Sequence, residues 1–273
     1  SLPTVGSSLE MDRLKSDFPN FAHVADFVWG RAMLSRLAHP AVMRLPPVLL
    51  DGPPGTGKTA FCTRLAQWLQ VPIHHVDMAS MDTAFKLTGL DAGYATGKPG
   101  AIWDALQGSC MAPIVVLDEL DKPSRASMES GLAYLLALLE PSSATRYKDA
   151  CVGLPLDASR MMWLATSNDV SAIDAPVLTR FRVFRVDAPT QHQMRSVILS
   201  VWRALREAEQ WANAFPEAMP EDFTAELIGL TPRAVRQSIE DACMRAAVAG
   251  RRVVRLADLQ PVAPLRSRGM GFL

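Results

Sequence analysis

The feature that most constrains this chain is a glycine-rich segment that follows a short apolar run and opens a helical pattern. It reads Gly52-Pro53-Pro54-Gly55-Thr56-Gly57-Lys58-Thr59 and fits the pattern G-x-x-x-x-G-K-[ST]. Glycines let successive backbone amides turn toward phosphates, and a helix amino terminus adds partial positive charge. We therefore expect this loop and Ala60 to bind a nucleotide, with Lys58 reaching the β- and γ-phosphates and Thr59 ligating magnesium.

Two adjacent carboxylates end a second apolar run. Asp118 and Glu119 directly follow residues 114–117, which have no polar member. The carboxyl ends of buried parallel strands are where ligands bind in open α/β sheets. We expect Asp118 to hold magnesium and Glu119 to polarise the attacking water as general base.

Apolar runs alternate with helical patterns through the first two-thirds of the chain. We expect strands at 48–50, 73–76, 114–117, 161–165 and 182–186, with helices between them. Uninterrupted apolar strands predict a parallel sheet covered by helices on both faces. After Pro189 the pattern is helical only. We predict a tail at 1–20, an α/β nucleotide-binding domain at 21–187 and a small all-helical lid domain at 188–273. The connection 141–158 is long enough to indicate a functional loop.

Composition narrows the classes of partner. Lys plus Arg and Asp plus Glu each number 28, so the formal net charge is zero, which argues against sequence-independent nucleic-acid binding. The longest apolar runs are too short for a membrane helix, and no signal peptide opens the chain, so we expect a cytoplasmic protein without a membrane partner.

The cysteine and histidine spacing predicts no metal centre. The four cysteines include no C-x-x-C pair, so neither a zinc site nor a redox motif is indicated. His74 and His75 are adjacent on an expected strand, so their side chains point to opposite faces and are poor joint ligands. We interpret both as ordinary histidines.

The glycine loop and the acidic pair together resemble the AAA+ ATPase family, whose core is a P-loop NTPase sheet. The resemblance implies ATP and Mg²⁺ as cofactors. Asn168, at the end of the run 161–167, resembles the family's first sensor, which holds the attacking water. Arg180, in 176–181, resembles the arginine finger that reaches the γ-phosphate of a neighbouring subunit, and Arg182 and Arg185 remain alternatives.

Two more segments match the family at lower specificity. Arg233, just inside a helix that begins at Pro232, resembles the second sensor, which closes the lid on ATP within one subunit. Trp29-Gly30 occupies the position of a Tyr-Gly pair on the adenine side in Lon-type members, so we expect Trp29 near the base.

Further details resemble the ATPase module of Lon-type proteases, over about residues 25–250. The stretch 93–100 is similar to the loop that grips polypeptide in the central pore, which implies that Tyr94 is the pore residue; packing under the glycine loop is the alternative. Residues 135–141 and 147–150 also resemble Lon segments. We expect no Lon-type Ser–Lys peptidase domain after the lid, so no proteolysis is assigned.

The resemblance implies a homo-oligomeric ring, by family analogy a hexamer, that couples ATP hydrolysis to unfolding or remodelling of a polypeptide substrate. A separate protease or adaptor would be a compatible partner. Two alternatives stay open: a nucleic-acid-associated AAA+ ATPase of the clamp-loader or helicase-loader type, and an ATP-gated scaffold with little turnover. The densest basic run, 251–255, is short.

Overall fold

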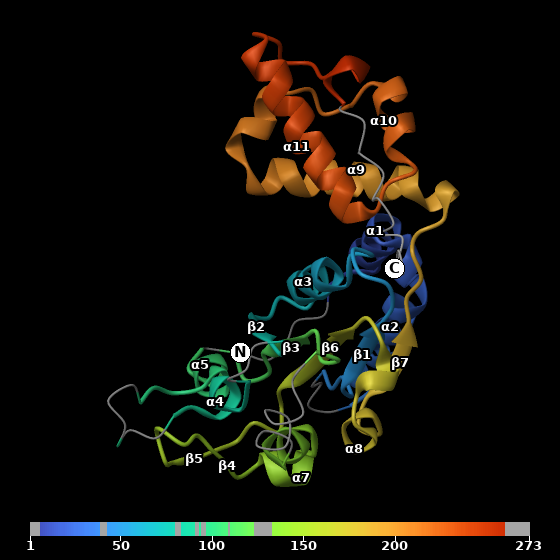
Figure 1. Cartoon of the computed structure of the whole chain (residues 1–273). Helices are drawn as coiled ribbons and strands as arrows, with labels where there is room; N and C mark the ends of the chain where they lie inside the picture. Colours follow the sequence, from blue (N-terminus) through green and yellow to red (C-terminus); the bar gives the residue numbers. More distant parts are fainter. Residues whose placement is uncertain are drawn as a thin grey trace, which may run out of the picture. The chain divides into compact units, whose positions relative to one another are not determined.

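A computed structural model describes residues 6–38, 43–79, 83–90, 93, 97–108, 110–122 and 133–259 of the chain. The chain divides into two compact units, residues 1–196 and 197–273 (Figure 1). The sequence predicts a domain boundary after residue 187, whereas the boundary between the two units lies inside the helix α9 (Gln191–Ala208).

The first unit is built around a five-stranded sheet in the order β2-β3-β6-β1-β7. Every neighbouring pair of strands in it is parallel. The strands are β1 (Val48–Asp51), β2 (Ile73–Asp77), β3 (Ile114–Asp118), β6 (Met162–Ser167) and β7 (Arg182–Arg185). The predicted parallel sheet is thereby confirmed, and the carboxyl ends of all five strands lie at one edge.

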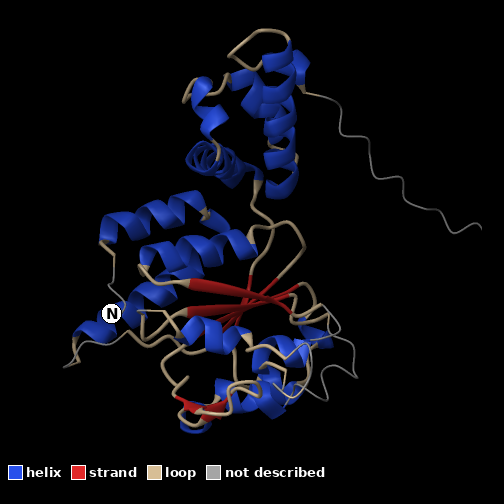
Figure 2. Ribbon diagram, turned by 90° about the vertical axis from the view of Figure 1, so that its left-hand side faces the viewer, coloured by secondary structure: helices blue, strands red, loops and turns tan. Residues whose placement is uncertain are grey.

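Side chains of the sheet alternate between two cores, one on each face. Val48 and Leu50 join a core with Phe21, Phe61 and Leu65, whereas Leu49 points into the opposite core. Because both faces are covered, the central strands are apolar up to the polar residues at their carboxyl ends, as expected for a buried parallel sheet. Figure 2 shows the helices lying on both sides of the strands.

Helices of one core come from the amino-terminal part of the chain, and those of the other from the middle. The first core is covered by α1 (Ser8–Asp17), α2 (Ala22–Arg36) and α3 (Lys58–Trp68). The second includes residues of α4 (Thr83–Thr88), α5 (Ala101–Leu106), the helical residues 133–139 and α8 (Ala175–Leu178).

Residues 8–20, part of the segment 1–20 that the sequence assigns to a tail, pack against helices that cover the sheet. α1 begins with a capping box, in which Ser7 and Glu10 satisfy each other's backbone N–H groups. Met11 and Leu14 are buried in the first core. This segment belongs to the packing of the first unit because its apolar face covers α2 and α3.

The long connection 141–158 contains α7 (Pro141–Ala144) and a two-stranded pair, β4 (Tyr147–Lys148) and β5 (Pro155–Leu156). It is organised by Asp149, which is fully buried and accepts hydrogen bonds from the backbone N–H groups of Gly100, Cys151 and Val152. Three N–H donors satisfy this buried carboxylate without a cation.

The second unit is helical, which confirms the predicted lid-type fold. It contains most of α9, then α10 (Glu221–Leu227) and α11 (Pro232–Val248), with short 3₁₀ turns at Gln210–Ala214 and Leu256–Asp258. Its buried side chains include Trp202, Leu205, Phe223 and Ile239. In the part of the chain that the structure describes, no helix is both long and apolar enough to span a membrane.

Candidate active site

The glycine loop lies where the sequence predicts, between β1 and α3, and its conformation requires glycine. Gly55 and Gly57 have φ values of 77° and 99°, in the left-handed region that favours glycine. A Cβ on Gly52 would lie 1.9 Å from the carbonyl oxygen of Val186. The loop therefore curls tightly against the end of β7 and presents the amino terminus of α3 to solvent.

Lys58 is held inside this loop by three acceptors. Its Nζ donates to the carbonyl oxygens of Gly52 and Pro53, at 2.6 Å and 2.9 Å, and to Oδ1 of Asn168 at 3.0 Å. Burial lowers the pKa of Lys58, and the carboxylates of Asp51, Asp121 and Glu119 oppose that shift. Three acceptors use all three protons of an ammonium group, so Lys58 is present as a cation.

Asp118 ends β3 beside the first turn of α3. Its Oδ1 accepts hydrogen bonds from the hydroxyls of Thr59, at 3.0 Å, and Thr166, at 3.1 Å. Its Oδ2 lies 2.8 Å from Nδ1 of His75 on the neighbouring strand β2. The structure therefore brings together the hydroxyl and the carboxylate that the sequence assigns to one metal ion.

Glu119 follows Asp118 in an uncommon backbone conformation. Its φ is 57°, which is rare for a residue with a side chain. Its N–H donates to the Thr166 hydroxyl at 3.0 Å, and the next N–H, of Leu120, donates to the Thr166 carbonyl. These two bonds to β6 fix the turn, and the Glu119 side chain is exposed at the same edge of the sheet.

These residues make a chemically coherent set at the carboxyl edge of the sheet. Lys58 and the amino terminus of α3 suit phosphate groups, and the oxygens of Thr59 and Asp118 are hard ligands of the kind Mg²⁺ prefers. Among the described residues, no group of three or more His, Cys, Asp or Glu side chains could hold a metal ion. One carboxylate and one hydroxyl fit magnesium that takes its remaining ligands from water and phosphate oxygens.

The family model "ATPase family associated with various cellular activities (AAA)" matches residues 48–187, which contain the whole of this arrangement. The chain belongs to the AAA family.

Its AAA domain is similar to that of Lon proteases. It is 30% identical over 168 residues to the peroxisomal Lon protease homolog 2 of Pichia angusta, a match that covers 60% of this chain and 18% of that protein. With Lon protease of Campylobacter jejuni the identity is 27% over 207 residues, or 72% of this chain and 26% of that protein. Lon protease of Helicobacter pylori is 29% identical over 147 residues. The matches thus span at most about a quarter of the length of these relatives.

The AAA domain also contains a buried acid that sequence reasoning missed. Asp51, the last residue of β1, is 2% exposed and accepts hydrogen bonds from the Ser167 hydroxyl at 2.7 Å and from Arg185 at 2.5 Å. Its only sequence signal is a carboxylate at the end of an apolar strand. Asp51, which directly precedes the glycine loop, is thus hydrogen-bonded to residues at the carboxyl ends of β6 and β7.

The three candidate finger arginines differ in their surroundings. Arg185 pairs with Asp51 of its own chain, and the Asp51 hydrogen bond raises the pKa of Arg185. Arg182 lies over aromatic rings, with its Cζ 4.4 Å from the centre of the Phe27 ring. Arg180 donates to the Pro176 carbonyl at 2.7 Å and forms no ion pair among the described residues. Among the described residues, neither Arg180 nor Arg182 has a carboxylate partner, and of these two only Arg182 lies over aromatic rings.

Trp29 and Gly30 lie inside α2 rather than beside the glycine loop. The Trp29 ring packs against Trp68, with ring centres 6.1 Å apart. Trp68 ends α3, and Lys58 begins it, so about 15 Å of helix separates this contact from the loop. The segment that does contact the loop is 18–23: Asn20 donates to the carbonyl oxygens of Thr56 and Asp187. The contact of Trp29 with the base stays a prediction.

The remaining predicted residues lie elsewhere. Arg233 is exposed in the first turn of α11, in the second unit, where the Thr231 hydroxyl caps the helix. Tyr94 lies outside the described residues.

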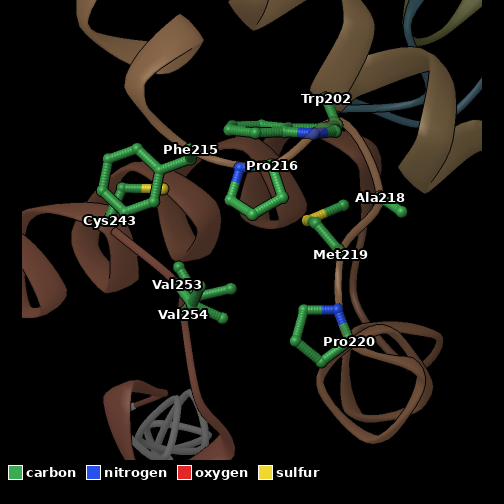
Figure 3. Close-up of a pocket in the computed structure, with 9 residues that line it drawn as sticks. All are labelled: Trp202, Phe215, Pro216, Ala218, Met219, Pro220, Cys243, Val253 and Val254. Atoms are coloured by element: carbon green, nitrogen blue, oxygen red, sulfur yellow. The ribbon is translucent and has the colours of Figure 1, made fainter. Parts of the chain in front are cut away.

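The second unit also has a small pocket, lined by apolar side chains and Cys243. Trp202, Phe215 and Met219 are among the lining residues (Figure 3). Without a charged lining residue, this pocket is not a phosphate site.

Proposed function

We propose that this chain is a Mg²⁺-dependent ATPase that works as a subunit of a ring and remodels a polypeptide substrate. The observation that carries the proposal is the convergence of Lys58, Thr59, Asp118 and Asn168 through direct hydrogen bonds at one edge of the sheet. These residues come from three separate motifs, and together they supply phosphate binding, metal ligation and orientation of the attacking water.

Binding of ATP would make Lys58 exchange some of its carbonyl and amide acceptors for phosphate oxygens. The cation would then neutralise part of the charge on the β- and γ-phosphates. Thr59 and Asp118 would hold the magnesium ion, which would neutralise negative charge on the phosphate groups when bound. Asn168, released from Lys58, would be free to orient the attacking water.

In the hydrolysis step, the water oxygen forms a bond to the γ-phosphorus while Glu119 accepts a water proton. The bond between the γ-phosphorus and the bridging oxygen breaks, and its electron pair stays with ADP. The products are ADP and inorganic phosphate. The exposed position of Glu119 at the sheet edge gives its carboxylate access to solvent water.

We assign the finger to Arg180, acting on the γ-phosphate of a neighbouring subunit. Arg185 is paired with the Asp51 carboxylate and Arg182 lies over the Phe27 ring, whereas Arg180 donates to a backbone carbonyl, which supports this choice. A finger supplied in trans accelerates phosphate hydrolysis by about 10³–10⁵ in other enzymes. Because the site would be completed only between subunits, a homo-oligomeric ring follows, and Arg233 would act from the lid of the same subunit.

The polypeptide substrate is proposed from similarity to proteins named Lon protease. In this assignment Tyr94 contacts the polypeptide, and a separate protease or adaptor is a compatible partner. The neutral net charge supports a polypeptide over nucleic acid as the substrate.

ATP turnover per subunit, measured across a range of protein concentrations, tests the proposal. We expect specific activity to rise steeply with concentration, and Glu119→Gln to bind ATP but turn it over at least about 100-fold more slowly. An unfolded polypeptide should stimulate turnover, and Tyr94→Ala should lose that stimulation. Stimulation by DNA alone would contradict the polypeptide assignment, and normal turnover by Glu119→Gln would contradict the assignment of the base.

A further inference from the structure

His75 lies within hydrogen-bonding distance of a proposed magnesium ligand, although the sequence marks it as an ordinary histidine. Its Nδ1 is 2.8 Å from Oδ2 of Asp118. A carboxylate has no proton to give, so the proton in this bond is on Nδ1. The His75 side chain is 36% exposed and that of Asp118 is 19% exposed, so the pair is at the border of the site.

The sheet register explains why His75, and not His74, reaches Asp118. In the parallel pair β2–β3, His75 is level with Val116, and Asp77 is level with Asp118. Positions two apart on a strand share a face, so His75 and Asp118 are diagonal neighbours on the face that α3 covers. His74 points to the opposite face, where burial lowers its pKa and the Asp104 carboxylate opposes that shift.

The two oxygens of Asp118 have separate partners. Oδ1 accepts from Thr59 and Thr166, whereas His75 donates to Oδ2. The Thr166 hydroxyl also accepts from the Glu119 N–H, so its own proton is committed to Asp118. With both oxygens held, rotation of the carboxylate is opposed from two sides, and Oδ1 stays directed at Thr59.

We propose that His75 is a positioning residue of the metal site, which orients the Asp118 carboxylate by donating a hydrogen bond to Oδ2. This role rests on the proposed function, because it matters only where Asp118 holds magnesium. Groups that hydrogen-bond to metal ligands commonly contribute about 10–100-fold to metal affinity. His75 on the edge strand β2 therefore adds a determinant that neither nucleotide motif contains.

The test uses the full chain and a fluorescent, non-hydrolysable ATP analogue, whose affinity is measured in EDTA and in Mg²⁺. The ratio of the two affinities reports how strongly metal and nucleotide are coupled, without any catalytic turnover. We expect His75→Ala to bind the analogue normally in EDTA but to lose about tenfold of the tightening that Mg²⁺ gives. Asn can place an amide N–H near the position of Nδ1, so His75→Asn should recover most of the loss. His74→Ala, on the other face, is the matched control and should behave as wild type.

Each other result has a definite meaning. Equal Mg²⁺ coupling in His75→Ala and wild type would overturn the role of His75 and leave the proposed function standing. An equal loss of affinity in EDTA and in Mg²⁺, or a lowered melting temperature without ligand that His75→Asn does not restore, would show a purely structural role and would also overturn it. No binding of the analogue by wild type in either condition would overturn the proposed function itself, and the role of His75 with it.

Discussion

Lys58 and Asn168, 110 residues apart in the chain, are joined by a 3.0 Å hydrogen bond between the ammonium group and the side-chain amide oxygen. The two residues end up adjacent because β1 and β6 are neighbouring parallel strands, and each residue follows the carboxyl end of its strand. The proposed nucleotide-binding cation and the proposed water-orienting amide are therefore in direct contact. Phosphate that engages Lys58 would release Asn168 for its role.

Removing the Lys58 side chain should weaken ATP binding. We expect Lys58→Ala to lose at least about tenfold in ATP affinity, because hydrogen bonds to charged groups contribute about 1.5–3 kcal/mol each. Asn168→Ala should keep most of the affinity but lose turnover. Fluorescent-nucleotide titration measures the first effect and phosphate release the second. Lys148→Ala, which removes an exposed lysine on β4, is the control. Full affinity in Lys58→Ala would contradict the assigned binding mode.

The positive φ of Glu119 predicts which of two substitutions at this position gives the more stable protein. Both Glu119→Ala and Glu119→Gly remove the carboxylate, but only glycine adopts φ 57° without strain. We expect the glycine variant to be more stable than the alanine variant by about 0.5–1 kcal/mol, because relief of strain exceeds the added chain entropy. Denaturant unfolding of the two variants measures the difference. If alanine were equally stable or more stable, the backbone there would not be strained.

Three arginine variants distinguish the proposed finger from its neighbours. Arg180→Ala should bind ATP normally and lose turnover, and mixing it with Lys58→Ala should restore some activity, because each supplies what the other's site lacks. Arg182→Ala should reduce turnover much less, since that side chain stacks on Phe27. Arg185→Gln should chiefly lower stability, because the buried Asp51 carboxylate would lose its cation. Failure of every mixture to regain turnover would argue that Arg180 does not act in trans.

The second unit should lose stability in acid through Asp258. This carboxylate is 5% exposed, and its bonds from Arg251, at 2.7 and 2.8 Å, hold its pKa below the ordinary value of 3.8. Because the folded state favours the charged form, the contribution is complete above that value. It is lost as the pH falls through the lowered pKa of the folded state.

The measurement is the melting temperature of wild type and Asp258→Asn as a function of pH. We expect the variant to be less stable at pH 7, by about 1–3 kcal/mol, and the difference to shrink as the pH falls to about 3. Glu240→Gln, which breaks an exposed ion pair with Arg236 on α11, should change stability by at most about 0.5 kcal/mol. A difference that stays constant with pH would mean that the Asp258 charge has no part in it.

The amino-acid sequence was sufficient to predict the parallel α/β fold, the helical second unit and the residues of the glycine loop and the acidic pair. These features are local. Apolar periodicity indicates which faces are buried, and a phosphate-binding loop has its glycines, lysine and threonine within one short segment. The packing of α1 was not predicted, because its two buried apolar side chains, Met11 and Leu14, give a weak periodic signal in a short polar segment.

Contacts between residues far apart in the chain depend on the tertiary structure. Strand order and register brought His75 to Asp118, Asp51 to Arg185, and Lys58 to Asn168. None of these pairs can be predicted from residue spacing. Each contact depends on which strands lie side by side and on which face of the sheet each residue lies. The same packing placed Trp29 against Trp68 rather than beside the phosphate loop. Local pattern thus specified the chemistry available, and long-range packing specified which groups meet.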